Sequence, residues 1–212
     1  MRLVLIAAAV AIFWVRLVPH GRARPARTPS VTDLSQTSPL NQPGGAAAPE
    51  DAYAVYSALY AVGTDEPLAF ASTSQTDIPQ VGGSCLKPKT KEEQAMADAF
   101  AAANQESHAW QSHFSIPQGY RVLPPGEVAQ VRGCLATGGH DANVCDRYKG
   151  IRHVRFLGVP GFDASRTHAL VSVIKNCGGF CGSGGIFEVE KSDGTWKRVP
   201  TTDFTRDCSW VY

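Results

Sequence analysis

The apolar and polar positions of the chain follow helical spacing in its first half and strand spacing in its second. Aromatic and alanine residues recur every few positions over residues 50–63, after two acidic residues that suit a helix N-terminus. Thr90 and Glu93 form a capping-box pattern ahead of an alanine-rich run, which predicts a second helix over Lys91–Trp110. The sequence therefore predicts two helices ahead of a strand-rich part.

After Pro117 the pattern changes to short apolar runs separated by turn residues. Phe187 and Val189 alternate with glutamates, so we expect one strand face to be buried against the helices. Asp193–Gly194 has the composition of a two-residue type I′ turn. A long polar loop is expected over residues 124–149. The expected strands are Tyr120–Leu123, Arg152–Val159, Ala169–Lys175, Ile186–Lys191, Thr195–Val199 and Ser209–Tyr212.

Short connections between these strands predict antiparallel pairing. We therefore expect a single α+β domain over residues 50–212, in which two N-terminal helices pack on one face of a C-terminal antiparallel β-meander and disulfides staple the domain. Hydrophobic residues make up 43% of the chain, which is enough for a core. Charged residues make up only 18%, which argues against coiled coils and basic nucleic-acid arms.

The first 20 residues are typical of an export signal. Arg2 precedes an uncharged apolar run from Leu3 to Val15, which is shorter than the ~20 residues of a spanning helix. Arginines around the candidate cleavage site leave a second interpretation open, an uncleaved membrane tether over Leu3 to Val18. Residues 1–20 are thus a signal peptide or anchor, and the proline-rich residues 21–49 a disordered linker. An extracytoplasmic protein is expected, whether periplasmic, secreted or membrane-tethered.

Charge is distributed unevenly along the chain. Residues 1–30 hold five arginines and no acid, which leaves 15 Lys and Arg against 19 Asp and Glu in the remainder. A folded part with this mild net negative charge does not attract a polyanion, so no nucleic-acid partner is expected.

Six cysteines in an exported chain indicate up to three disulfides. Spacing favours the local pairs Cys134–Cys145 and Cys177–Cys181, which leaves Cys85–Cys208 as a long-range pair. Three alternatives fit the spacing less well. They are redox chemistry at Cys177 and Cys181, a zinc site that uses Cys134 and Cys145, and nucleophilic attack by Cys181 with His153 or His168 as base.

The remaining chemically active residue types form no recognised catalytic pattern. Glu188 and Glu190 share a strand face, but a solvated face is the simpler interpretation. The glycines of residues 178–185 do not follow dinucleotide or P-loop spacing and favour a tight hairpin. Tyr53, Tyr56 and Tyr60 are expected in the core and rim of the first helix. No metal-ligand spacing is found among His108, His113, His140, His153 and His168. No catalytic, cofactor-binding or metal-binding residue is therefore predicted.

Five segments of the C-terminal part carry a resemblance to known sequences. They are Val159–Asp163, Thr167–Val171, Cys177–Gly185, Glu190–Lys197 and the terminal Trp210. Over residues 151–212 the chain resembles a group of uncharacterised bacterial exported proteins. The resemblance implies an exported, sheet-rich domain and brings no activity and no catalytic residues. The hairpin around Gly194–Lys197 also resembles those of cone-shaped α+β folds of the nuclear-transport-factor-like kind.

These features predict an exported, non-enzymatic domain that binds a small ligand or a protein partner and needs no cofactor. The alternative is a small extracytoplasmic hydrolase with its site between helices and sheet, where such folds place ligands. A deep pocket with converging Glu, Asp or His side chains would favour the hydrolase.

Overall fold

The computed structural model describes residues 46–61, 66–76, 78, 85–139 and 142–211. These residues belong to one compact unit of the chain, which spans Thr37–Tyr212. The expected signal or anchor over residues 1–20, and almost all of the expected linker, lie outside the described residues. Within the described part, no helix is both long and apolar enough to span a bilayer.

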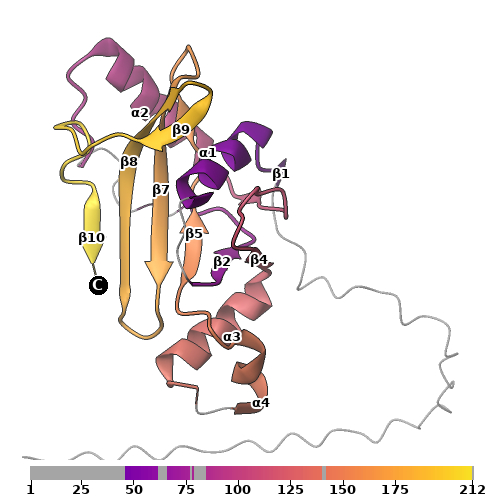
Figure 1. Cartoon of the computed structure of the whole chain (residues 1–212). Helices are drawn as coiled ribbons and strands as arrows, with labels where there is room; N and C mark the ends of the chain where they lie inside the picture. Colours follow the sequence, from indigo (N-terminus) through magenta and orange to yellow (C-terminus); the bar gives the residue numbers. More distant parts are fainter. Residues whose placement is uncertain (1–45, 62–65, 77, 79–84, 140–141, 212) are drawn as a thin grey trace, which may run out of the picture. The chain divides into compact units, whose positions relative to one another are not determined.

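A mixed, eight-stranded sheet forms the centre of this unit (Figure 1). Its main path runs β10 (Ser209–Val211), β8 (Gly182–Ser192), β7 (His168–Asn176), β5 (Val154–Leu157), β2 (Leu68–Ala71) and β4 (Tyr120–Leu123). In addition, β6 (Gly161–Phe162) pairs with β7, and β9 (Thr195–Arg198) pairs with β8. A separate two-stranded parallel pair joins β1 (Ala46–Ala47) to β3 (His108–Ala109).

The expected antiparallel meander is present but forms only part of the sheet. Strands β5, β7, β8 and β9 pair antiparallel, and so do β10 and β8. The expectation of a purely antiparallel sheet was wrong, because β2 pairs parallel with both β4 and β5. All four residues of β2 are buried, so its sequence shows no polar alternation that would mark it as a strand.

The helices are α1 (Glu50–Ala61), α2 (Lys91–Ala103), α3 (Pro125–Ala136) and α4 (Ala142–Cys145), followed by the short 3₁₀ turn η2 (Asp146–Tyr148). The capping box at Thr90 and Glu93 is confirmed. Two expectations were wrong. Helix α2 stops at Ala103 and not at Trp110, because the side chain of Asn104 turns back to bind the carbonyl oxygens of Phe100 and Val159. The expected loop over residues 124–149 contains α3, which starts with proline at its first position, where no N–H is needed.

Helices cover both faces of the sheet, and not one face as expected. Val171 and Val189 point to the α1 side, where they join Val55 in one buried cluster. Leu170 and Ile186, on the opposite face of the same two strands, join Phe100 of α2 in a second cluster. Helix α3 packs on that second side, against Ala69 and Ala71 of β2. Alternation along the strands therefore yields two buried faces.

The turn between β8 and β9 has the predicted geometry. Asp193 and Gly194 have φ of 53° and 76°, the left-handed values that a type I′ turn requires. Ser192 and Thr195 are the last paired residues on either side. Val189 is buried and Phe187 half-buried against the α1 cluster, so this strand faces a helix as expected.

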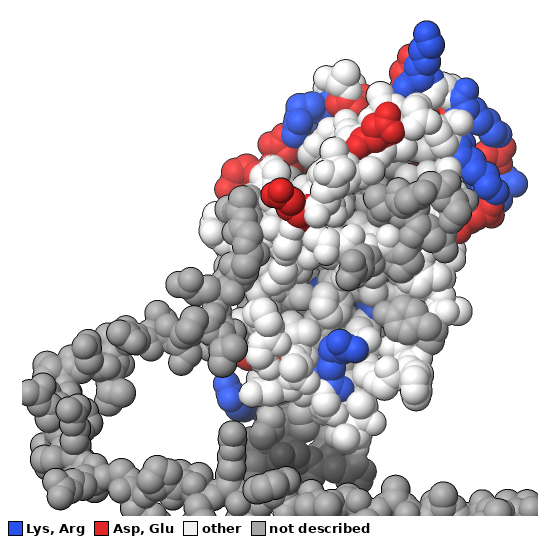
Figure 2. Space-filling view, turned by 180° about the vertical axis from the view of Figure 1, so that it is seen from behind, with Lys and Arg blue, Asp and Glu red and all other residues white. Residues whose placement is uncertain are grey.

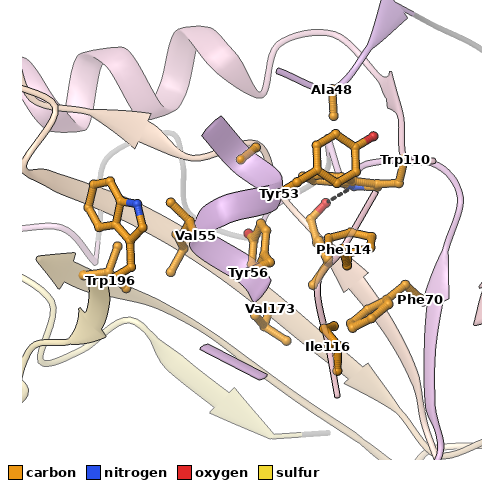
Figure 3. Close-up of a cluster of buried hydrophobic side chains, with 14 of the residues drawn as sticks. Ala48, Tyr53, Val55, Tyr56, Phe70, Trp110, Phe114, Ile116, Val173 and Trp196 are labelled. Carbon is orange, nitrogen blue, oxygen red and sulfur yellow. Dashed lines mark hydrogen bonds between the residues drawn. The ribbon is translucent and has the colours of Figure 1, made fainter. Parts of the chain in front are cut away.

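Aromatic side chains of α1 form the centre of the larger cluster (Figure 3). The rings of Tyr53 and Tyr56 meet Trp110 edge-on, with centroids 5.2 and 5.5 Å apart. The Tyr56 hydroxyl lies 2.7 Å from the carbonyl oxygen of Gly158 and 2.9 Å from that of Ser172, which ties α1 to strand β7 and to the residue that follows β5. Burial raises the pKa of Tyr56 well above its ordinary value. These tyrosines are core residues, as the sequence indicates.

Candidate ligand-binding groove

The structure joins the six cysteines in the three pairs that their spacing favours, and none is left free. Cys85–Cys208 ties the segment before α2 to the segment before β10, with its Cα atoms 5.0 Å apart. Cys134–Cys145 links α3 to α4, and Cys177–Cys181 closes the β7–β8 turn. Because Cys181 is bonded to Cys177, it is not a nucleophile in this state. The disulfides therefore form a framework.

The glycine-rich stretch builds a hairpin and not an anion cradle. Gly178 and Gly179 adopt φ of 88° and 53° in the β7–β8 turn, and residues 182–185 continue as strand. A side chain at Gly184 would meet the Trp210 ring, 2.6 Å away, so close packing explains this glycine. Phe180, at the tip, is 99% exposed.

Glu188, Glu190 and His168 lie together on the α2 side of the sheet. His168 Nε2 is 4.0 Å from Glu190 Oε2, and desolvation by partial burial raises the pKa of Glu188. His153 is elsewhere, with Nδ1 3.3 Å from Glu66 Oε2. Within the described residues, no three His, Cys, Asp or Glu side chains are grouped closely enough to hold a metal ion. His140 lies outside the described residues.

The best candidate site is a cavity of about 390 Å³ between α1, the β6–β7 loop and the β8–β9 hairpin. Phe162 and Trp196 supply apolar rings, with centroids 5.8 Å apart. Two cations, Arg166 and Lys191, and one carboxylate, Asp51, supply the charge. The remaining lining residues are Ala54, Ser165 and Thr167.

A second cavity of about 280 Å³ continues along α1 and shares Ala54, Lys191 and Trp196 with the first. On the helix it is lined by small residues at helical spacing, Ala54, Ser57, Ala58 and Ala61. The hairpin side supplies Gly194 and Thr195, and Ser115 completes the lining. We call these two adjoining cavities the α1 groove. The buried ring of Trp196 reaches toward Val55 of α1 (Figure 3), so it fixes the spacing between the two walls.

The β6–β7 loop is held rigid by Asp163. Its Oδ1 accepts from the backbone N–H of Thr167 at 2.8 Å and of His168 at 3.0 Å, and its Oδ2 accepts from the Ser165 hydroxyl. Partial burial works to raise the pKa of Asp163, but these hydrogen bonds outweigh it and leave the pKa lowered. The carboxylate of Asp163 is therefore used to stabilise the loop, which is the usual role of Asp in such turns.

Arg166 is the most unusual residue of the loop. Its φ of 56° is left-handed, a conformation that favours glycine or asparagine. Its guanidinium lies 4.2 Å from the centroid of the Phe162 ring and pairs with the carboxylate of Asp51. Holding a long cation in a strained position costs about 1–3 kcal/mol, and such strain is concentrated at functional sites.

Another cleft, of about 270 Å³, lies at the carboxyl ends of β2 and β4. It is lined by Ala71–Thr76, Pro125, Val128 and Phe156, and none of these side chains is charged. Ser74 Oγ accepts from the His108 N–H at 2.8 Å, whereas the buried Ser72 hydroxyl has no described partner. The α1 groove therefore has the stronger chemistry for a ligand.

None of the groove residues belongs to a recognised catalytic or binding motif, so sequence reasoning missed all of them as a site. In the sequence, Thr195 and Trp196 stand out as strand residues after a turn and as part of the hairpin that carries the resemblance, neither of which points to a site. The one usable signal was Arg166 at a turn position, where glycine or asparagine is common.

On the face seen from behind, Lys and Arg stand among Asp and Glu, without a large surface of one sign (Figure 2).

Comparisons with known proteins found no matching family model, no matching curated protein and no matching solved structure.

Proposed function

We propose that the protein is an extracytoplasmic domain that binds a small ligand or a segment of a partner in the α1 groove, without transforming it. The observation that carries the proposal is the combination of two adjoining cavities with Arg166, a cation kept in a strained conformation at their edge. Three disulfides suit an oxidising compartment outside the cytoplasm. We propose that the protein is periplasmic, secreted, or tethered to the membrane through Leu3–Val18.

The chemistry of the groove supports binding over hydrolysis. Its one described carboxylate, Asp51, is neutralised by Arg166, and its lining contains no histidine. The nearby Asp163, Ser165 and His168 do not form a relay, because the Ser165 hydroxyl bonds directly to Asp163 and not to the imidazole. A hydrolase needs an acid or base poised toward its substrate.

A groove-filling variant tests the proposal. Ala54 is exposed and lines both cavities, so Ala54→Trp should fill the groove. Ala102→Trp is the matched control, since Ala102 is exposed on α2. A set of small carboxylic acids and short peptides is screened by saturation-transfer NMR against both variants and the parent. We expect hits that the parent and Ala102→Trp share and Ala54→Trp loses. Hits that all three share equally, or no hits, would refute the proposal.

A further inference from the structure

We propose that the ligand of the α1 groove is an extended peptide segment that carries an acidic side chain. This inference rests on the proposed function and adds the class of the ligand. Three properties of the groove support it: its length, the free edge of β9, and the sign of the charge on its hairpin wall.

The length of the groove fits a short extended chain. Its helical wall runs from Asp51 to Ala61, which at a rise of 1.5 Å per residue is about 15 Å. An extended chain rises about 3.3 Å per residue, so four to five residues, roughly, span it. Small side chains at Ala54, Ser57 and Ala58 let a main chain approach the helix closely.

Strand β9 offers unpaired main-chain groups beside the groove. Among the described strands it pairs with β8 alone, and it lies next to α1 (Figure 1). In a two-residue hairpin the residues that flank the turn are hydrogen-bonded, so Thr195 and Lys197 direct their N–H and C=O groups to β8. The N–H of Val199 donates to Glu188, which continues this alternation. The groups of Trp196 and Arg198 therefore point away from β8, where an extended peptide can add as a further strand.

The hairpin presents positive charge to the groove. Lys191 and Arg198 share the face that also carries Val189 and Trp196, whereas Glu188 and Glu190 share the opposite face. No described carboxylate lies within 4.0 Å of the Lys191 ammonium, which stands 5.9 Å from the Trp196 ring. Arg166 shares its charge with Asp51, and Arg198 lines neither cavity, so Lys191 is the groove cation left to meet an acid of the ligand.

Two five-residue peptides test the inference. Both are blocked at their ends and alternate Val and Thr around a central residue, which is Asp in one and Asn in the other. Affinities are measured by NMR titration of the disulfide-bonded protein. We expect the Asp peptide to bind about fivefold more tightly, the gain that one exposed ion pair supplies. Lys191→Gln should remove this preference. Lys197→Gln, a control on the other face of the same hairpin, should keep it.

An Asp peptide with N-methyl groups on alternate amides keeps the charge but cannot pair with β9, so it should lose binding. Equal affinity of the Asp and Asn peptides, or full binding of the N-methylated peptide, would overturn the inference. Binding of small carboxylic acids in the groove without binding of any peptide would overturn the inference and leave the proposed function standing. If neither acids nor peptides bind there, both fail.

Discussion

Removing the three disulfides one at a time should destabilise the protein in the order of the loops they close. The bonds join cysteines separated by 123, 11 and 4 positions. In the chain-entropy model these closures are worth about 4.9, 2.8 and 1.9 kcal/mol at 25 °C. Cys85 and Cys208 are also buried, at 2% and 0% exposed, so their replacement loses packing as well and widens the gap.

In each of three variants, both cysteines of one disulfide are replaced by Ala, and unfolding in urea is followed by circular dichroism. The variant at Cys85 and Cys208 should lose the most free energy of unfolding, and the variant at Cys177 and Cys181 the least, about 2 kcal/mol or below. Titration of thiols in denatured parent protein should find none free. If the closure at Cys177 and Cys181 proved as important as the one at Cys85 and Cys208, loop entropy would not explain the framework.

Three further predictions test the fold. Gly161→Ala would push a methyl group into the backbone of Phe100 and should lower the free energy of unfolding, measured by chemical denaturation, by about 1–3 kcal/mol. The control Gly133→Ala, with open space around it, should leave that free energy unchanged or raise it. Similar effects of the two variants would disprove close packing of β6 on α2. Gly194→Val should lower stability by about 1 kcal/mol or more, because a β-branched residue resists φ of 76°, and an unchanged Tm would count against the turn. Burial raises the pKa of Tyr60 to about 12 from 10.0, against the opposing effect of Arg155. Its contribution to stability is therefore complete below pH 10 and is lost as the pH rises through about 12. Tyr60→Phe should make the alkaline loss shallower in denaturation midpoints taken across that range, and parallel losses in parent and variant would contradict this assignment.

Local signals predicted the parts of the fold that local interactions determine. The capping box at Thr90 and Glu93 marks the start of α2, and Asp193–Gly194 marks the β8–β9 turn, because each involves only neighbouring residues. The cysteine spacing was informative for a similar reason, since two pairs lie close along the chain.

Other parts depend on contacts between distant segments and could not be predicted. Helix α3 contains Gly126 and Gly133 and has little amphipathic pattern, so it reads as a loop. The covering of both sheet faces depends on α1 packing on one face and α2 and α3 on the other, which local patterns do not determine. The α1 groove draws on α1, the β6–β7 loop and the β8–β9 hairpin, and these meet only in the folded chain.

The account depends most on the claim that the α1 groove binds a ligand. The most direct test is a search for intermolecular NOEs between the bound Asp peptide and the protein. We expect cross-peaks from the methyl groups of Ala54 and Ala58 and from the indole of Trp196, all of which line the groove. Cross-peaks to Val128 and Phe156 instead would place the ligand in the cleft beside β2 and contradict the claim.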